Sequence, residues 1–437
     1  MKKSLCLILA LLILLTAFGI YLYKWKSPTP PDEEIADDTV EEGEEEEEVE
    51  LTYSDSVDWD KFRGQGITIN VYNWGEYISV DEGEDEFDTN REFEKLTGIN
   101  VNYSTFATNE ELYAKLKGGG TKYDIIVPSD YMLSRMINEG MLEKLDLSNI
   151  PNVEYMDETI DTSYDPTGEY SVPYMWGVVG IIYNTKMIDE NDDLETWDIL
   201  WDAKYTGSIL MFSSPRDAFG VAEKKLGYSY NTEDPEELAA AAEELKRQKP
   251  LVQAYVADEV FDKMGGGEAA LAVYYAGDAI TMMEDNPDLG FVVPREGTNI
   301  YTDAMCIPKD APHKEAAEMY INFMCETKVA LANCEYTCYS TPHTEAYKYL
   351  DEETQTSYSY PDEEVKAKGE VYHALSDPAS KILDEHWTDI MSSGNSSPWT
   401  VVIFIFVCVA AIVGINVYKH FKKKKIELEK VENLHEE

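Results

Sequence analysis

Positively charged residues are scarce in this chain. Its 437 residues include 36 lysines and arginines against 85 aspartates and glutamates, for a formal net charge of −49. This balance argues against a nucleic-acid-binding surface, because such surfaces neutralise phosphates with basic side chains. It favours cationic partners, although acidity of this kind more often serves only solubility.

Cysteine is also rare, with six residues in all. Two of them, Cys6 and Cys408, lie in long apolar runs. The other four are Cys306, Cys325, Cys334 and Cys338. Four such residues permit disulfides in an oxidising compartment without fixing any pairing. The Cys334–Cys338 spacing suits two ligands on one helix face, but no second cysteine pair lies near it, and we expect no metal and no cofactor.

Two uncharged apolar runs are each about as long as a bilayer is thick. Residues 4–23 follow Lys2 and Lys3 and are typical of a secretory signal or a membrane anchor. Because no small-residue cleavage site stands out, an uncleaved anchor is favoured. The second run, residues 399–418, is predicted to be a transmembrane helix.

The second run also predicts orientation. Trp399 and Tyr418 stand at its ends, as in an aromatic belt, and a lysine cluster follows at once in residues 419–437. Because lysine clusters mark the cytoplasmic side, residues 419–437 are predicted to be a cytoplasmic tail. The bulk of the chain is then an extracellular domain tethered to the cell membrane.

Between the two runs the composition changes twice. Residues 27–60 begin rich in proline and become almost wholly acidic, which predicts an extended, disordered spacer. From about residue 67 to 389, apolar strand-like runs alternate with amphipathic helical segments. This alternation predicts an α/β fold of parallel sheets with helices on both faces. A stretch of roughly 320 residues exceeds one comfortable core and predicts two lobes.

The expected elements follow the spacing of the apolar residues. Strands are expected at residues 67–74, 99–106, 123–129, 178–184, 207–214, 268–277 and 289–294. Helices are expected at residues 91–98, 109–120, 130–145, 234–248 and 313–334. In open α/β sheets, ligands bind beyond the carboxyl ends of strands. Side chains that follow these strands are therefore the first candidates for a site.

Aromatic and acidic side chains gather at such places. They are Trp74, Glu76, Tyr77, Ser129, Asp130, Tyr131, Tyr274, Tyr275, Asp278, Tyr301 and Asp303. Carboxylates would hold the nitrogens of a cationic alkylamine, and aromatic faces would lie along its methylenes. A ring face over an ammonium contributes about 0.5–2 kcal/mol, and a desolvated carboxylate–ammonium bond roughly 1.5–3 kcal/mol.

Structural roles are the alternative for the same residues. Trp74 would then be a core residue at the end of a strand. Glu76 and Asp303 would be ordinary loop acids. Asp278 would be the N-cap of the helix that follows it, since aspartate is a good N-cap.

Long stretches of the sequence resemble the spermidine/putrescine-binding proteins, the substrate-capturing components of polyamine ABC transporters. They occur in order from about residue 67 to 387 and include YNWGEYI, YDIIVPSDYMLSRMINEGMLEKLD, YSVPYMWG and TWDILWDAKYTGSI. The resemblance implies a periplasmic-binding-protein-like α/β fold of two lobes crossed by hinge strands, with the polyamine between them. One lobe would comprise residues 66–178 with 302–345, and the other residues 179–301 with 346–390.

Carried over residue by residue, the resemblance implies ligand-binding positions in both lobes. They are Trp74, Glu76, Tyr77, Ser129, Tyr131, Asp217, Tyr275, Asp278, Tyr301, Asp303 and Tyr372. The chain departs from the family pattern where Ser214 replaces one acid of an acidic pair, and where Tyr275 and Tyr301 replace tryptophans. Asp278, which putrescine-type members share, gives a slight preference for putrescine over spermidine.

We therefore predict a membrane-anchored extracellular protein, not an enzyme, that captures putrescine or spermidine for an ABC permease. Two alternatives stay open. A binding protein or sensor for another cationic solute would use the same side chains, although the tail is far too short for a kinase module. A glycoside hydrolase would use paired carboxylates in a cleft.

Overall fold

The computed structural model of the chain describes residues 51–80, 87–120 and 122–393. Among these residues, no helix is both long and apolar enough to cross a membrane. Several predicted segments lie outside the described residues. They are the apolar runs at 4–23 and 399–418, the tail at 419–437, and the spacer up to residue 50.

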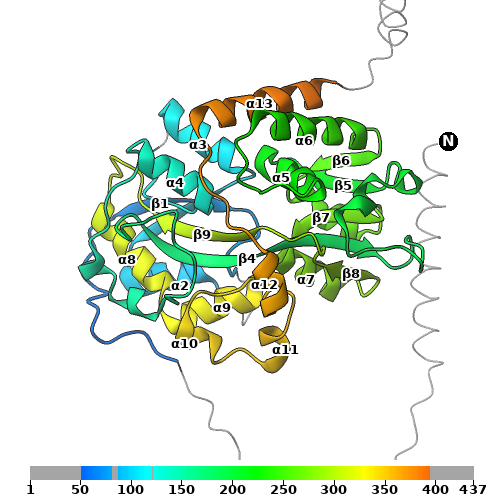
Figure 1. Cartoon of the computed structure of the whole chain (residues 1–437). Helices are drawn as coiled ribbons and strands as arrows, with labels where there is room; N and C mark the ends of the chain where they lie inside the picture. Colours follow the sequence, from blue (N-terminus) through cyan, green and yellow to red (C-terminus); the bar gives the residue numbers. More distant parts are fainter. Residues whose placement is uncertain (1–50, 81–86, 121, 394–437) are drawn as a thin grey trace, which may run out of the picture. The chain divides into compact units, whose positions relative to one another are not determined.

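Within the described residues, nine strands form one mixed sheet (Figure 1). The strands are β1 (Thr68–Trp74), β2 (Asn100–Phe106), β3 (Ile125–Ile126), β4 (Ser171–Asn184), β5 (Ile209–Phe212), β6 (Val252–Val256), β7 (Leu271–Tyr275), β8 (Leu289–Val292) and β9 (Ile300–Cys306). Their order is β2-β1-β3-β9-β4-β7-β5-β6, with β8 beside β4. The α/β class expected from the sequence is confirmed.

Helices connect and cover these strands. The α-helices are α2 (Thr89–Thr97), α3 (Asn109–Gly118), α4 (Asp130–Asn138), α5 (Pro215–Lys225), α6 (Pro235–Gln248), α7 (Ala276–Asp285), α8 (Lys314–Met324), α9 (Thr327–Thr337), α10 (Thr344–Tyr347), α11 (Glu352–Gln355), α12 (Glu363–Lys368) and α13 (Asp377–Ser392). Short 3₁₀ or π turns are η1 (Leu147–Asn149), η2 (Pro151–Tyr155), η3 (Trp197–Trp201), η4 (Ala203–Tyr205) and η5 (Phe261–Gly265). Helix α13 packs against α5 and α6, beside β5 and β6 (Figure 1).

The long strand β4 joins two groups of strands. Over residues 171–178 it pairs with β9, which lies beside β3, β1 and β2. Over residues 179–184 it pairs with β7 and β8, next to β5 and β6. We call these the first and second strand groups. Gly177 lies at the crossing, where a Cβ atom would come 2.5 Å from the Tyr301 hydroxyl oxygen.

Strand direction is only partly as expected. In the first group β1 is parallel to β2 and β3, and in the second β5 is parallel to β6 and β7. The expectation of purely parallel sheets is wrong for β4, β8 and β9, which pair antiparallel with their neighbours. An apolar run indicates burial, but it carries no information on the direction of the strand beside it.

Two predicted helices are shorter than expected. The helix expected at 130–145 ends with α4 at Asn138, and Gly140 follows at a φ of 66° that only glycine adopts without strain. The helix expected at 313–334 divides into α8 and α9, which are separated at Cys325 and Glu326. In both cases apolar residues continue past the break because the following segment is also buried.

The predicted disordered spacer extends too far. Its last part, residues 51–60, packs on the folded domain. Trp59 is 9% exposed, and its ring lies 6.2 Å from that of Phe323 in α8. The Tyr53 ring lies 5.7 Å from the same phenylalanine, and the Ser54 amide donates to Glu326 at 3.1 Å. The acidic composition of the segment predicted disorder, but Tyr53 and Trp59 make apolar contacts with Phe323 in the folded domain.

The cysteines of the domain form no disulfide within the described residues. Cys306, Cys325 and Cys334 are buried and Cys338 is partly buried, all as free thiols. A buried free cysteine behaves as a small apolar residue. The described residues also contain no cluster of three or more His, Cys, Asp or Glu side chains that could hold a metal ion.

The aromatic anchor at residue 59 generates a prediction about stability. Trp59→Ala should lower the free energy of unfolding by about 3 kcal/mol, because it removes a large buried ring. Denaturant unfolding of the full-length chain measures the change. The control Asp55→Ala alters an exposed residue of the same segment and should change it by less than about 0.5 kcal/mol. Equal stability of both variants would mean that residues 51–60 do not dock.

Candidate ligand-binding site

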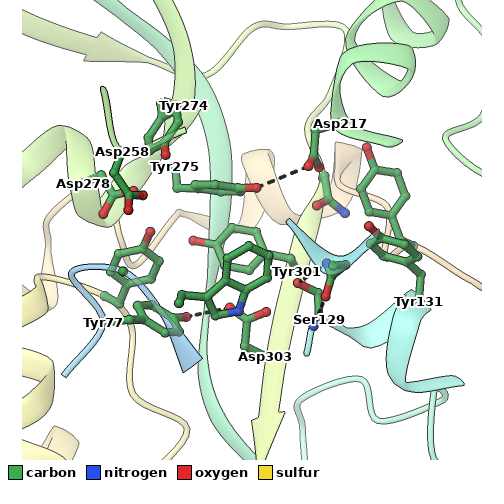
Figure 2. Close-up of a pocket in the computed structure, with 16 residues that line it drawn as sticks. Tyr77, Ser129, Tyr131, Asp217, Asp258, Tyr274, Tyr275, Asp278, Tyr301 and Asp303 are labelled. Atoms are coloured by element: carbon green, nitrogen blue, oxygen red, sulfur yellow. Dashed lines mark hydrogen bonds between the residues drawn. The ribbon is translucent and has the colours of Figure 1, made fainter. Parts of the chain in front are cut away.

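A cavity lies where strand ends of both groups converge (Figure 2). Its lining residues are Trp74, Gly75, Tyr77, Asn109, Ser129, Tyr131, Asp217, Asp258, Tyr274, Tyr275, Asp278, Asn299, Tyr301, Asp303, Tyr339 and Tyr372. Most of them follow the carboxyl ends of β1, β2, β3, β5, β6 and β7, where open α/β sheets place ligands. Ten of the eleven residues predicted from the sequence line this one cavity. Their role in binding stays a prediction.

Asp303 lies on β9 in the first strand group. Its Oδ2 accepts a hydrogen bond of 2.7 Å from the Tyr77 hydroxyl, while its Oδ1 has no hydrogen-bond partner among the described residues. Ser129 pairs with it as an isolated β-bridge. Burial raises the pKa of Asp303 to about 6, against the opposing effect of the Ser129 and Tyr77 hydroxyls. An unpaired, buried carboxylate oxygen is costly, so this position suits a cationic donor.

Asp217 occupies the first turn of α5, just beyond β5. Its Oδ2 accepts a hydrogen bond of 3.3 Å from the Tyr275 hydroxyl, which points toward it in Figure 2. Burial raises the pKa of Asp217, while the hydroxyls of Ser214 and Tyr275 and the charge of Arg216 lower it. Ser214, the N-cap of α5, makes no side-chain capping bond.

Asp278 lies in the first turn of α7, and it is 8% exposed. The N-cap of that helix is Tyr275, so the alternative role of Asp278 as the N-cap is wrong. Burial, together with the charges of Asp258, Glu76 and Asp303, raises the pKa of Asp278 to about 8. A nearby Tyr339 hydroxyl acts in the opposite direction.

Aromatic rings form the walls between these carboxyl groups. The Tyr275 and Tyr301 rings meet edge to face with centroids 5.0 Å apart, and Tyr77 meets Tyr339 in the same way at 4.7 Å. Trp74 packs on Phe106 at 4.4 Å, and its indole Nε1 has no hydrogen-bond partner among the described residues. The walls therefore offer ring faces for apolar and cationic groups together.

No basic side chain occurs among the lining residues, all of which belong to the described part of the chain. Arg216 lies close by, 4.6 Å over the ring of Tyr372, but its Nη2 donates to Asn231 and to the His373 carbonyl. Four aspartates thus share a cavity without an internal counter-charge. Like charges held together in this way disfavour one another's ionisation.

Glu76 is placed differently from the prediction. Its side chain is exposed and is not among the residues that line the cavity, so the expectation that it forms one wall with Trp74 and Tyr77 is wrong. The backbone turns sharply there, with a φ of 45° at Glu76 itself. Only its charge reaches the site, where it raises the pKa values of Asp258 and Asp278.

Six lining residues are not among the eleven predicted ligand-binding positions. They are Gly75, Asn109, Asp258, Tyr274, Asn299 and Tyr339. Asp258 lies two residues after the end of β6. A sequence analysis that included β6 among the strands would have placed Asp258 among the candidates, because ligands bind beyond the carboxyl ends of strands. Tyr274 belongs to an expected strand and lines the cavity because β7 ends at Tyr275. Tyr339 follows a helix end, and no local pattern points to it.

Comparison with known proteins identifies the family. The model of the family described as "Bacterial extracellular solute-binding protein" matches residues 90–362. The chain belongs to this family. A spermidine/putrescine-binding periplasmic protein of Salmonella typhimurium is 38% identical over 323 residues, which cover 73% of this chain and 90% of that protein. A putrescine-binding periplasmic protein of Pseudomonas aeruginosa is 30% identical and covers 78% of this chain and 96% of its own.

A solved structure agrees in fold. The spermidine/putrescine ABC transporter substrate-binding protein of Streptococcus pneumoniae has a TM-score of 0.62 and 38% identity, covering 75% of this chain and 99% of that one. The α/β, periplasmic-binding-protein-like fold is therefore confirmed. These relatives are binding proteins, and this solute-binding protein is likewise not an enzyme.

The buried Asp278 makes stability depend on pH. The pKa of an unfolded aspartate is about 3.9, and that of Asp278 in the folded protein is about 8. The protonated side chain therefore contributes stability that is fully present below about pH 4 and is lost as the pH rises through about 8. Between pH 5 and 9 the ligand-free wild type should lose stability relative to Asp278→Asn, by on the order of 3 kcal/mol. Denaturant unfolding at pH 5, 7 and 9 measures this difference. A difference that stays constant with pH would show that Asp278 is not held in this environment.

Proposed function

We propose that this solute-binding protein captures a polyamine, putrescine or spermidine, outside the cell and passes it to an ABC transporter. The observation that carries the proposal is the cavity itself, lined by four aspartates and eight aromatic side chains without a basic residue among them. The names of its relatives, spermidine/putrescine-binding and putrescine-binding proteins, support the same ligand class.

A polyamine meets the needs of both kinds of lining residue. At neutral pH its amines are ammonium groups, each able to donate to a carboxylate, and its methylenes are apolar. The unpaired Oδ1 of Asp303 offers an acceptor for one ammonium. The rings of Tyr275 and Tyr301 offer faces for the chain between the nitrogens. Each desolvated charge-assisted bond would contribute about 1.5–3 kcal/mol.

Residues of both strand groups would hold the ligand, and this predicts closure of two lobes. We infer that the lobes predicted from the sequence, residues 66–178 with 302–345 and residues 179–301 with 346–390, are built around the two strand groups that β4 joins. Bending of β4 between its two halves would open the cavity, and contacts from both sides would favour the closed form. The close approach of Asp258 to Gly75, between the groups, supports this proposal.

Delivery and anchoring complete the proposal. The predicted apolar runs at 4–23 and 399–418 would hold the binding domain at the outer face of the cell membrane. Anchoring would keep it at high local concentration near its permease, in place of free diffusion. The acidic spacer would separate the domain from the membrane surface.

Calorimetry of the full-length chain tests the function. We expect putrescine and spermidine to bind with dissociation constants below about 1 mM, because two charge-assisted bonds contribute about 3–6 kcal/mol and about 4 kcal/mol corresponds to 1 mM. Maltose, a neutral ligand that also suits aromatic walls, is the control and should not bind measurably. If neither polyamine binds below that concentration, the proposed function is wrong.

The buried carboxylate of β9 generates a further prediction. Asp303→Asn keeps an acceptor for the Tyr77 hydroxyl but removes the charge that faces the ligand. It should weaken polyamine binding by about 1.5–3 kcal/mol, measured by calorimetry.

The matched control is Asp262→Asn, an exposed aspartate of η5 that is absent from the cavity lining. It should leave the dissociation constant unchanged within a factor of about two, since it contacts no ligand. An Asp303→Asn chain that binds as tightly as this control would remove Asp303 from the site.

A further inference from the structure

Strand β6 borders a surface groove that lies apart from the ligand cavity. It is the last strand in the order of the sheet, and no strand pairs with its outer edge among the described residues. The groove has a volume of about 650 Å³. It is lined by residues 252–255 of β6, by Lys246 and Lys249 at the end of α6, and by Ser393 directly after α13, which packs on α6 (Figure 1). We call it the β6 groove.

The β6 groove is basic, in a chain whose formal net charge is −49. Lys246 and Lys249 line it, and none of its lining residues, all within the described part of the chain, is an aspartate or a glutamate. The ligand cavity has the opposite character, with aspartates and no basic residue in its lining. Arg247 stands between the two lysines in the sequence, and its side chain is 69% exposed. The β6 groove therefore suits an anionic partner.

The two lysines also hold the end of α13 in place. Lys249 Nζ donates to the Met391 carbonyl at 2.8 Å and to the Ile390 carbonyl. Lys246 Nζ lies 2.7 Å from Asp389 Oδ2. Carbonyl oxygens accept hydrogen bonds without cancelling the charge of the donor, so Lys249 keeps its positive charge at the groove. These bonds fix the lysines in position beside Ser393.

The surroundings of the β6 groove are amphipathic. The Tyr255 hydroxyl has no hydrogen-bond partner among the described residues, and its ring meets that of Trp387 edge to face with centroids 5.5 Å apart. Met391, in the last turn of α13, is 43% exposed. Lysine, tyrosine and tryptophan beside an exposed apolar side chain are typical of a surface at a membrane–water interface.

The sequence beyond Ser393 limits how far this face can lie from a membrane. Ser393 is the last described residue, and the predicted transmembrane run begins at Trp399. The five residues between them reach at most about 22 Å when fully extended. Residues 24–50, between the first apolar run and the described domain, could reach about 90 Å. With both runs in the membrane, the shorter connection keeps the end of α13 and the β6 groove close to it.

We propose that the β6 groove binds the head groups of anionic phospholipids and seats the second strand group on the outer face of the cell membrane. The inference rests on the anchoring part of the proposed function. Phosphate oxygens would accept from Lys249, Lys246 and the Tyr255 hydroxyl. Each basic side chain that reaches an anionic membrane surface favours the contact by about five-fold. With the second strand group held in this way, opening of the cavity would move the first group, to which the longer connection leads.

Hydrogen exchange of the full-length chain in lipid nanodiscs tests this docking. The amides of residues 246–256 should exchange at least about five-fold more slowly in discs that contain phosphatidylglycerol than in discs of phosphatidylcholine alone. The difference should disappear at about 1 M salt, where the Debye length is about 3 Å. Equal exchange in the two lipids would overturn the inference. Equal protection in detergent micelles would also overturn it, because residues 394–398 of the chain would then fill the groove.

Two groove variants and one control test the role of charge. Lys249→Gln should reduce the difference between the lipids to less than about two-fold. Because this change also removes bonds to α13, Gln253→Glu is the second variant, which adds an acid at an exposed groove position and should have the same effect. The control Lys381→Gln alters an α13 lysine that is 76% exposed and does not line the groove, and it should keep the difference. A difference retained in both groove variants would contradict the proposal.

Two further outcomes separate the possible ligands and the two proposals. Inorganic phosphate should release the protection no more than sodium chloride of the same ionic strength. A larger effect of phosphate would assign the β6 groove to the free anion and overturn lipid docking. Failure of the chain to co-purify with either kind of disc would overturn the anchoring and this inference with it. Polyamine binding, measured separately by calorimetry, would be unaffected by either result.

Discussion

Four aspartates held in one cavity without a basic side chain among the lining residues are the constraint on which the rest of this structure depends. Burial raises the pKa of Asp278 to about 8 and that of Asp303 to about 6, so Asp278 keeps its proton near neutral pH. In the proposed function, a polycation would replace protons with ammonium groups. Contacts with such a ligand would offset the cost of desolvating the buried carboxyl groups.

The sheet places these groups where they can act together. Strand β4 pairs with β9 over its first half and with β7 and β8 over its second, so one strand belongs to both groups. Asp303 on β9 and Asp278 after β7 consequently face one cavity although they lie in different groups. The same arrangement brings Asp258 against Gly75, a contact possible only because position 75 carries no side chain. In the proposed function, affinity and closure would depend on the same strands.

Much of the fold could be predicted because apolar periodicity reports burial. The strands that end at Trp74 and Phe106 begin and end within a residue of the expected ranges, and ten predicted residues line one cavity. The exceptions have physical causes. Glu76 follows the strand pattern, but a backbone turn with a φ of 45° carries its side chain into solvent. Trp59 is buried although it follows an acidic segment, and the average composition of that segment predicted disorder.

The sequence by itself determined the α/β class, the membership of a solute-binding family and the chemical character of the site, because residue type and strand ends are local properties. Only the tertiary structure decided which carboxyl groups share a cavity, as the exclusion of Glu76 and the inclusion of Asp258 and Tyr339 show. It also decided the antiparallel course of β4 and β9. These outcomes depend on contacts between segments far apart in the chain, such as Asp258 with Gly75, and no local pattern encodes such distances.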